Sequence, residues 1–127
     1  MGDEHPTWSL KGGVPVLRCT HCSRCGRTMF PAQEYGCTNC GAFGDVLEIS
    51  ELPAEGTLLT FAVVHRHDRH PVPFTLGEIE IGSDGPIVRA LLGDGHEPAI
   101  GDRVRARVVE GEGQQRLEFV AATEVNA

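Results

Sequence analysis

Two Cys-x-x-Cys-Gly segments constrain this chain more than any other feature. They are Cys-Ser-Arg-Cys-Gly at residues 22–26 and Cys-Thr-Asn-Cys-Gly at residues 37–41, and 11 residues lie between Cys25 and Cys37. Each segment offers two sulfurs in one turn, and a short hairpin can bring the two turns together around a tetrahedral metal ion. The glycine suits a backbone that turns sharply there, often with positive φ. The predicted ligands of a zinc ion are Cys22, Cys25, Cys37 and Cys40. A site closed by four sulfurs leaves no position for substrate, which indicates a structural metal.

A fifth cysteine leaves a second assignment open. Cys19 precedes Cys22 with the same spacing, so Cys19-Thr-His-Cys22 is an alternative first turn. We favour Cys22 and Cys25, because a glycine follows Cys25 just as a glycine follows the second pair, and Cys19 then becomes a spare thiol. Iron remains an alternative metal, since thiolates accept both ions. Disulfides are disfavoured by the odd count and by the lack of a visible export signal.

Composition narrows the class of protein. The 127 residues suffice for one compact domain or two very small ones. The formal net charge of −7 argues against a nucleic-acid partner, because nucleic-acid modules usually present a basic face. No apolar run approaches the roughly 20 residues of a membrane helix. We therefore expect a cytoplasmic protein with neither a membrane nor a nucleic acid as partner.

The rest of the chain is patterned for strands. With 16 glycines and 8 prolines, helices are disfavoured. Alternation and β-prone runs separated by turn residues predict five short strands, at 57–64, 74–81, 87–92, 104–108 and 117–121. Five strands of this kind fit an OB-like barrel. The predicted fold is mainly β, a rubredoxin-like zinc ribbon followed by a five-stranded OB-fold barrel. Its predicted parts are an N-terminal arm (1–17), the zinc ribbon (18–50) and the OB-fold domain (51–127). Trp8 in the arm is expected to dock on the protein's own fold.

The order of these features resembles one known family. The two cysteine segments, Phe30-Pro31 between them, the strand Gly-Thr-Leu-Leu-Thr-Phe-Ala-Val-Val-His at 56–65 and Ile-Gly-Asp-Arg-Val at 100–104 carry the resemblance. It covers about residues 17–123. The family is the zinc-ribbon plus OB-fold family of acyl-CoA-associated proteins, formerly a domain of unknown function. Ala32-Gln33 stand where a Pro-Arg is common in it.

The resemblance implies a non-catalytic accessory subunit with structural Zn²⁺. Members associate with thiolase-type or acyltransferase enzymes, and some with aldolases or hydratases of acyl-CoA metabolism. The expected role is to stabilise the partner in a hetero-oligomer and to shape its CoA and substrate channel. This step rests on family likeness and not on spacing or charge.

Candidate contacts to a partner or to CoA lie in two places. Apolar side chains at the ribbon tip have two interpretations, contact with a partner or packing beneath the metal: Phe30, Pro31 and Tyr35. The second place is a histidine-rich loop and the strand after it, with His65, His67, His70 and Phe74. A solvated loop is the simpler interpretation of the histidines, and a second metal site is the least favoured.

A basic row on the predicted strand 104–108 has two interpretations. Arg103, Arg105 and Arg107 could meet CoA phosphates, since guanidinium forks match phosphate oxygens. We favour ordinary cross-strand pairs with Glu78, Glu80 or Glu118.

An independent enzyme is the weakest hypothesis. The sequence shows no nucleophile and base at a recognisable spacing, no Gly-rich phosphate loop and no open metal site. A nucleic-acid-binding zinc-ribbon and OB module is the stronger rival, because both modules bind nucleic acid elsewhere. The acidity and the few aromatic residues oppose it. We therefore predict an accessory subunit of an acyl-CoA enzyme, with a thiolase-type partner favoured over an aldolase or a hydratase.

Overall fold

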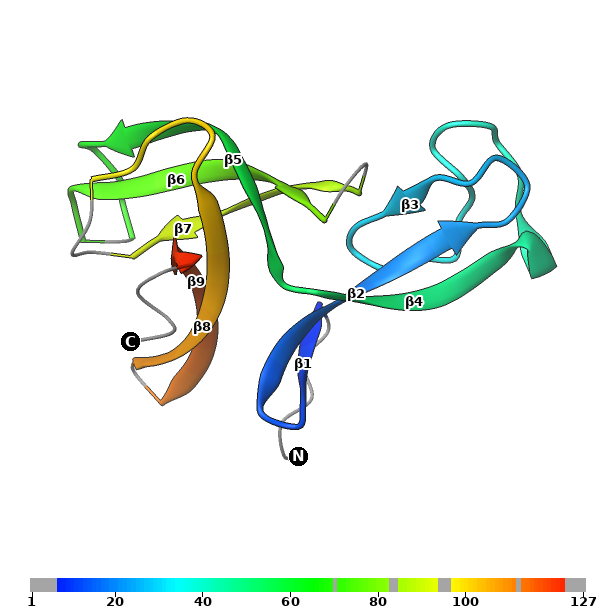
Figure 1. The fold of residues 1–127 in the computed structure, drawn as a ribbon, viewed down its shortest axis with the longest axis horizontal. Coiled ribbons are helices and arrows are strands. Elements are labelled where there is room, and N and C mark those ends of the chain that lie inside the picture. The colour runs from blue at the N-terminus through cyan, green and yellow to red at the C-terminus, as the bar shows by residue number, and fades with distance from the viewer. Residues whose placement is uncertain (1–6, 70, 83–84, 94–96, 112, 123–127) are drawn as a thin grey trace. The chain divides into compact units, whose positions relative to one another are not determined.

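The structure is a computed structural model that describes residues 7–69, 71–82, 85–93, 97–111 and 113–122 (Figure 1). Its contacts divide the chain into two units. One comprises residues 1–54 with 81–86, and the other comprises residues 55–80 and 87–127. The first holds a small antiparallel sheet and both cysteine turns, and the second holds most of a closed barrel.

The ribbon sheet is organised around strand β2 (Val14–Cys22). On one edge β2 pairs with β1 (Trp8–Lys11) and then with β3 (Thr28–Met29), and on the other with β4 (Leu47–Pro53). A two-residue turn joins β1 to β2, with Gly12 and Gly13 at φ of 59° and 84°. Two consecutive positive φ angles are what the tight turn favoured in hairpins requires, and glycine adopts them without strain. The N-terminal arm therefore contributes a strand, which the sequence analysis did not predict.

The apolar cluster at the cysteine turns is small. Trp8 is buried in β1, as expected, and its partner across the strands is the buried Leu17. A separate small cluster at the cysteine turns consists of Cys22, Met29, Cys37 and Ala42, with Val46 and Leu47 packed against it. The single-turn 3₁₀ helix η1 (Gly44–Val46) leads from the second cysteine turn into β4. So few apolar side chains leave much of this module's folding free energy to a bound metal.

The barrel consists of β5 (Glu55–Val64), β6 (Phe74–Ile81), β7 (Ile87–Leu92), β8 (Arg103–Gly111) and β9 (Gln114–Ala121). The strands close in the order β5-β6-β7-β9-β8, in which β7 and β9 run parallel. This closed, five-stranded arrangement is that of an OB fold. Its core is formed by alternating inward-facing residues, and the most fully buried are Phe119, Leu58, Ile79 and Ile81.

The predicted fold class is confirmed: the described chain is mainly β, with a closed five-stranded barrel and a cluster of four cysteines. The predicted strands 74–81 and 87–92 have the bounds observed for β6 and β7: alternation marks the end of β6, and the turn residues at 82–86 mark the start of β7. The remaining barrel strands begin earlier than predicted, and β8 also ends later. In the described part of the chain, no helix has the length and apolar character needed to span a membrane.

Candidate metal centre

The two cysteine turns have the same backbone conformation. The amide of Gly26 donates to the carbonyl of Cys22 at 2.8 Å, and the amide of Gly41 donates to that of Cys37 at 2.9 Å. Both glycines have positive φ, 85° and 81°. A side chain would strain this conformation, so the glycine that follows each pair allows the chain to turn back over its two sulfurs.

A second hydrogen bond also repeats between the turns. The amide of Cys22 donates to the carbonyl of Arg27, and that of Cys37 donates to the carbonyl of Ala42, both at 2.8 Å. Each turn is thus closed by two backbone bonds at equivalent positions. The Cys-x-x-Cys-Gly sequence sets this local geometry before any metal is considered.

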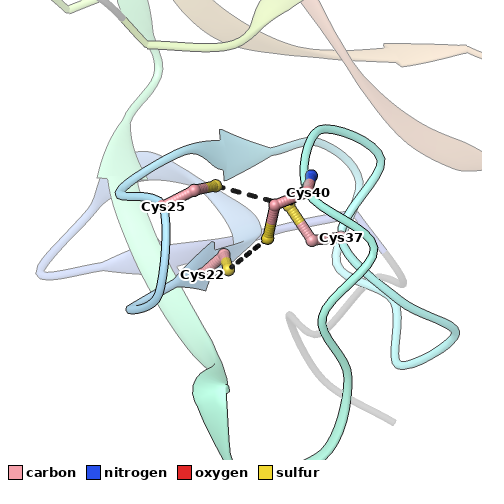
Figure 2. Close-up of side chains that lie close together, drawn as sticks. All are labelled: Cys22, Cys25, Cys37 and Cys40. Carbon is pink, nitrogen blue, oxygen red and sulfur yellow. Dashed lines mark hydrogen bonds between the residues drawn. The ribbon is translucent and has the colours of Figure 1, made fainter.

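The four sulfurs converge on one point (Figure 2). All lie within 4.8 Å of one another; Cys22 and Cys40 are 3.7 Å apart, and Cys25 and Cys37 are 3.5 Å apart. A tetrahedral ion with Zn–S bonds of about 2.3 Å would separate its sulfurs by about 3.8 Å. The observed spacing therefore fits a tetrahedral, four-thiolate metal site. In the described part of the chain, this is the group of side chains placed to hold a metal ion.

Hydrogen bonds within the cluster prepare some of these thiols to ionise. The Asn39 side chain, followed by the Arg27 backbone, lowers the pKa of Cys25 to about 6. Backbone amides of Cys40 and Asn39 point at the Cys37 sulfur, at 3.4 Å and 3.3 Å, and lower the pKa of that thiol. These bonds favour the thiolate, which is the form that binds metal.

The pKa of Cys40 is shifted in the opposite direction. The Ala42 backbone lowers its pKa, but burial and the neighbouring thiols of Cys22, Cys37 and Cys25 raise it to about 11. Like charges at this separation disfavour a fully ionised set. A divalent cation at the centre would supply the compensating charge and allow four thiolates.

Cys19 lies outside the cluster. Its side chain is fully buried, and its thiol donates to the Leu17 carbonyl at 3.8 Å. Burial raises the pKa of Cys19 to about 11, so the neutral thiol is favoured. On β2, Cys19 is three positions from Cys22, so the two side chains point to opposite faces of the strand. The Cys19 sulfur therefore lies away from the four that converge.

The ribbon tip presents an aromatic side chain to solvent. Tyr35 is 95% exposed, Pro31 is exposed and Phe30 is half-buried. The Gln33 side chain holds the loop behind Tyr35: its Oε1 accepts from the amides of Tyr35 at 2.6 Å and Gly36 at 3.2 Å, and its Nε2 donates to the Gly36 carbonyl at 2.7 Å. The Gln33 backbone is itself bonded to the hydroxyl of the buried Thr20, in both directions.

This role of Gln33 was missed by sequence reasoning. Its anchor, Thr20, lies 13 residues away on β2, and no local pattern connects the two. A polar residue beside an exposed tip otherwise resembles any solvated loop residue.

The histidine loop and Phe74 lie on the barrel unit. His65 and His67 are exposed, and the ring of His67 meets that of Phe74 edge to face, with centroids 5.4 Å apart. Phe74 also lines a shallow hollow of about 280 Å³ with Val63 and Leu91. His70, the remaining predicted contact, lies outside the described residues.

The basic row on β8 is paired across both of its neighbours. Arg107 bonds to Glu118 on β9 at 2.8 Å and 3.2 Å, Arg105 lies 3.5 Å from Glu55 on β5, and Arg103 donates to Thr57 at 3.1 Å. Of the predicted acidic partners, Glu78 instead pairs with Arg89 on β7. Cross-strand pairing of the row is thus present, but of the predicted acidic partners only Glu118 is bonded to it among the described residues.

Comparisons with known proteins find one family model and solved structures that are similar to this chain. Residues 50–109 match the family model described as "ChsH2, C-terminal OB-fold domain". Among solved structures, a chain of "Ltp2-ChsH2(DUF35) aldolase" is similar with a TM-score of 0.66 and 21% identity, and the match covers 84% of each chain. At this identity the likeness establishes the fold. No curated protein gives a significant match. The resemblance drawn from the sequence is thereby confirmed for the barrel: residues 50–109 are similar to the C-terminal OB-fold domain of ChsH2.

Proposed function

We propose that this protein is a non-catalytic, zinc-binding accessory subunit of an enzyme that makes or breaks a carbon–carbon bond in an acyl-CoA. The observation that supports this most directly is the combined match: four converging cysteines precede an OB barrel similar to the C-terminal OB-fold domain of ChsH2, in a fold shared with a chain of an aldolase complex. The zinc ligands in this proposal are Cys22, Cys25, Cys37 and Cys40.

The candidate metal centre supports a structural role. All four tetrahedral positions would be filled by sulfur, so no position remains for a substrate or an activated water. In the described residues, no second group of potential ligands comes together. Catalysis would therefore belong to the partner, which this subunit would stabilise and whose substrate channel it would shape.

Two partner classes follow from different observations. The sequence resemblance favours a thiolase-type enzyme, whereas the name of the similar structure favours an aldolase. Both act at carbon–carbon bonds, and both would use CoA thioesters bound in a hetero-oligomer. The exposed Tyr35, Pro31 and His67, with half-buried Phe30 and Phe74, are the proposed partner or CoA contacts; His65 and His70 complete that proposal.

The test is purification of the tagged, zinc-loaded chain from the cells that make it, followed by mass spectrometry and reconstitution. We expect a stoichiometric thiolase-type enzyme or aldolase whose acyl-CoA activity falls when this subunit is withdrawn and returns when it is added back. Recovery with nucleic acid, or activity independent of this chain, would contradict the proposal.

A further inference from the structure

A groove on the ribbon sheet is an unassigned surface with a definite chemical character. On the face of the sheet where Thr20 of β2 lies opposite Ile49 of β4, Gln33 covers Thr20. Ile49 stays 57% exposed beside it. We call this surface the ribbon groove and define it by Thr20, Gln33, Glu34, Asp45 and Ile49.

The walls of the ribbon groove are fixed by the fold. One wall is the loop held by Gln33, which bonds to Thr20 and to the backbone at Tyr35 and Gly36. The other wall follows the second cysteine turn and includes Asp45 of η1. A hollow of about 390 Å³ lies between them, and a second hollow that shares Gln33, Glu34 and Ile49 continues toward Tyr35. A preorganised surface of this kind loses little conformational entropy on binding.

The groove combines an apolar floor with an acidic rim. Glu34 and Asp45 line it and are both exposed, and among the described residues no ion pair neutralises them. Among the described residues that line the adjoining hollow, Arg18 is the cation and Tyr35 the aromatic residue. Asp45 therefore marks the η1 end of the groove, Glu34 borders both hollows, and the aromatic surface lies at the Tyr35 end.

We infer that the ribbon groove is a docking site for a basic segment of the partner enzyme, in which an apolar side chain covers Ile49 and lysine or arginine side chains meet Glu34 and Asp45. Charge complementarity selects this occupant, because an acidic partner would be repelled by the two carboxylates of the groove. Tyr35 adds an aromatic side chain of the kind that dominates binding energy at interfaces. The inference rests on the proposed function, since the partner is the acyl-CoA enzyme.

The test measures affinity between the zinc-loaded chain and the acyl-CoA enzyme recovered in the experiment above, purified separately. Ile49→Ser should weaken binding by about tenfold or more, as expected for a central contact. Ile87→Ser is the matched control, because Ile87 is also a strand isoleucine, is 59% exposed and lies on the barrel strand β7. It should change affinity by less than about threefold. Zinc content and circular dichroism confirm that both variants are folded.

Charge is tested separately. The pair Glu34→Lys and Asp45→Lys should weaken binding and reduce its dependence on salt, whereas Glu110→Lys on β8 should alter neither. If the wild-type chain binds the enzyme and Ile49→Ser binds it equally well, the ribbon groove is not the docking site, while the proposed function still stands. If binding is lost with Ile49→Ser but does not respond to salt or to charge reversal, the basic character of the occupant is wrong. If wild-type chain binds no such enzyme, both proposals fail.

Discussion

The sulfurs of Cys22 and Cys40 lie 3.7 Å apart although 18 residues separate them in the chain. Each belongs to a turn closed by the same backbone hydrogen bond, from the amide of a positive-φ glycine. Two locally determined turns thus become one site when the sheet brings them together, and that relationship suggests the first experiments.

Removing one ligand should abolish metal binding. In Cys40→Ser, one of four tetrahedral positions loses its thiolate, and the ribbon, which has few apolar contacts, should unfold with loss of zinc. Zinc content by mass spectrometry and circular dichroism measure the result.

The matched control is Cys19→Ala. This thiol is buried but lies outside the cluster, so the variant should keep a full equivalent of zinc. Loss of zinc from Cys19→Ala, with retention in Cys40→Ser, would overturn the ligand assignment.

The affinity for zinc should rise with pH, and more steeply below about pH 6. Metal must displace any proton on its ligands. The pKa of Cys40, about 11, keeps that thiol protonated throughout the neutral range. Zinc must displace its proton at every pH in that range, so Cys40 contributes the same slope of affinity against pH throughout. Cys25, with a pKa of about 6, is already ionised above that pH and competes with a proton only below it. Competition titrations with a chromogenic chelator across this range provide the measurement.

Asn39→Ala offers the control for this pH dependence. Its side chain makes the largest contribution to the low pKa of Cys25. Without it, that pKa rises toward the ordinary value, and the steeper region should move to higher pH. A slope that stays constant from acid to neutral pH in the wild-type chain would contradict the assignment of ionised Cys25.

Gln33→Ala should loosen the ribbon tip while the metal centre persists. The amides of Tyr35 and Gly36 lose their acceptor, although water can replace part of it at this exposed loop. We expect a loss of about 1 kcal/mol in unfolding free energy and faster hydrogen exchange at these two amides. Gln115→Ala, which removes a single 3.4 Å bond to Glu110, should leave exchange at the tip unchanged. Equal exchange in both variants would show that Gln33 does not hold the loop.

Phe119→Ala should destabilise the barrel severely. The ring is 1% exposed and is among the most fully buried side chains, so its removal leaves a cavity and costs about 3–5 kcal/mol. Ile87→Ala, at a position 59% exposed, should cost well under about 1 kcal/mol. Urea unfolding followed by circular dichroism compares them, and similar midpoints for the two variants would mean that the barrel core lies elsewhere.

The sequence by itself determined the local features. The Cys-x-x-Cys-Gly spacing specifies a turn that folds over its own sulfurs, because the ligand positions and the glycine lie within five residues. Alternation specified β6, because a strand in a barrel wall has one buried face and one exposed face, and the turn residues at 82–86 specified where β7 begins. The Gly12-Gly13 turn was equally local; its hairpin signal was present in the sequence and was overlooked.

Only the tertiary structure decided which distant residues meet. The pairing of Arg105 with Glu55 depends on the register of β8 against β5, and a strand's own sequence does not state its register with a partner 50 residues away. The hold of Gln33 on Thr20, and the exposure of Ile49 opposite that same threonine, likewise follow from the way loop and strands pack. Local sequence fixes backbone preference and the side of a strand on which a residue lies, whereas long-range pairing decides what covers that side.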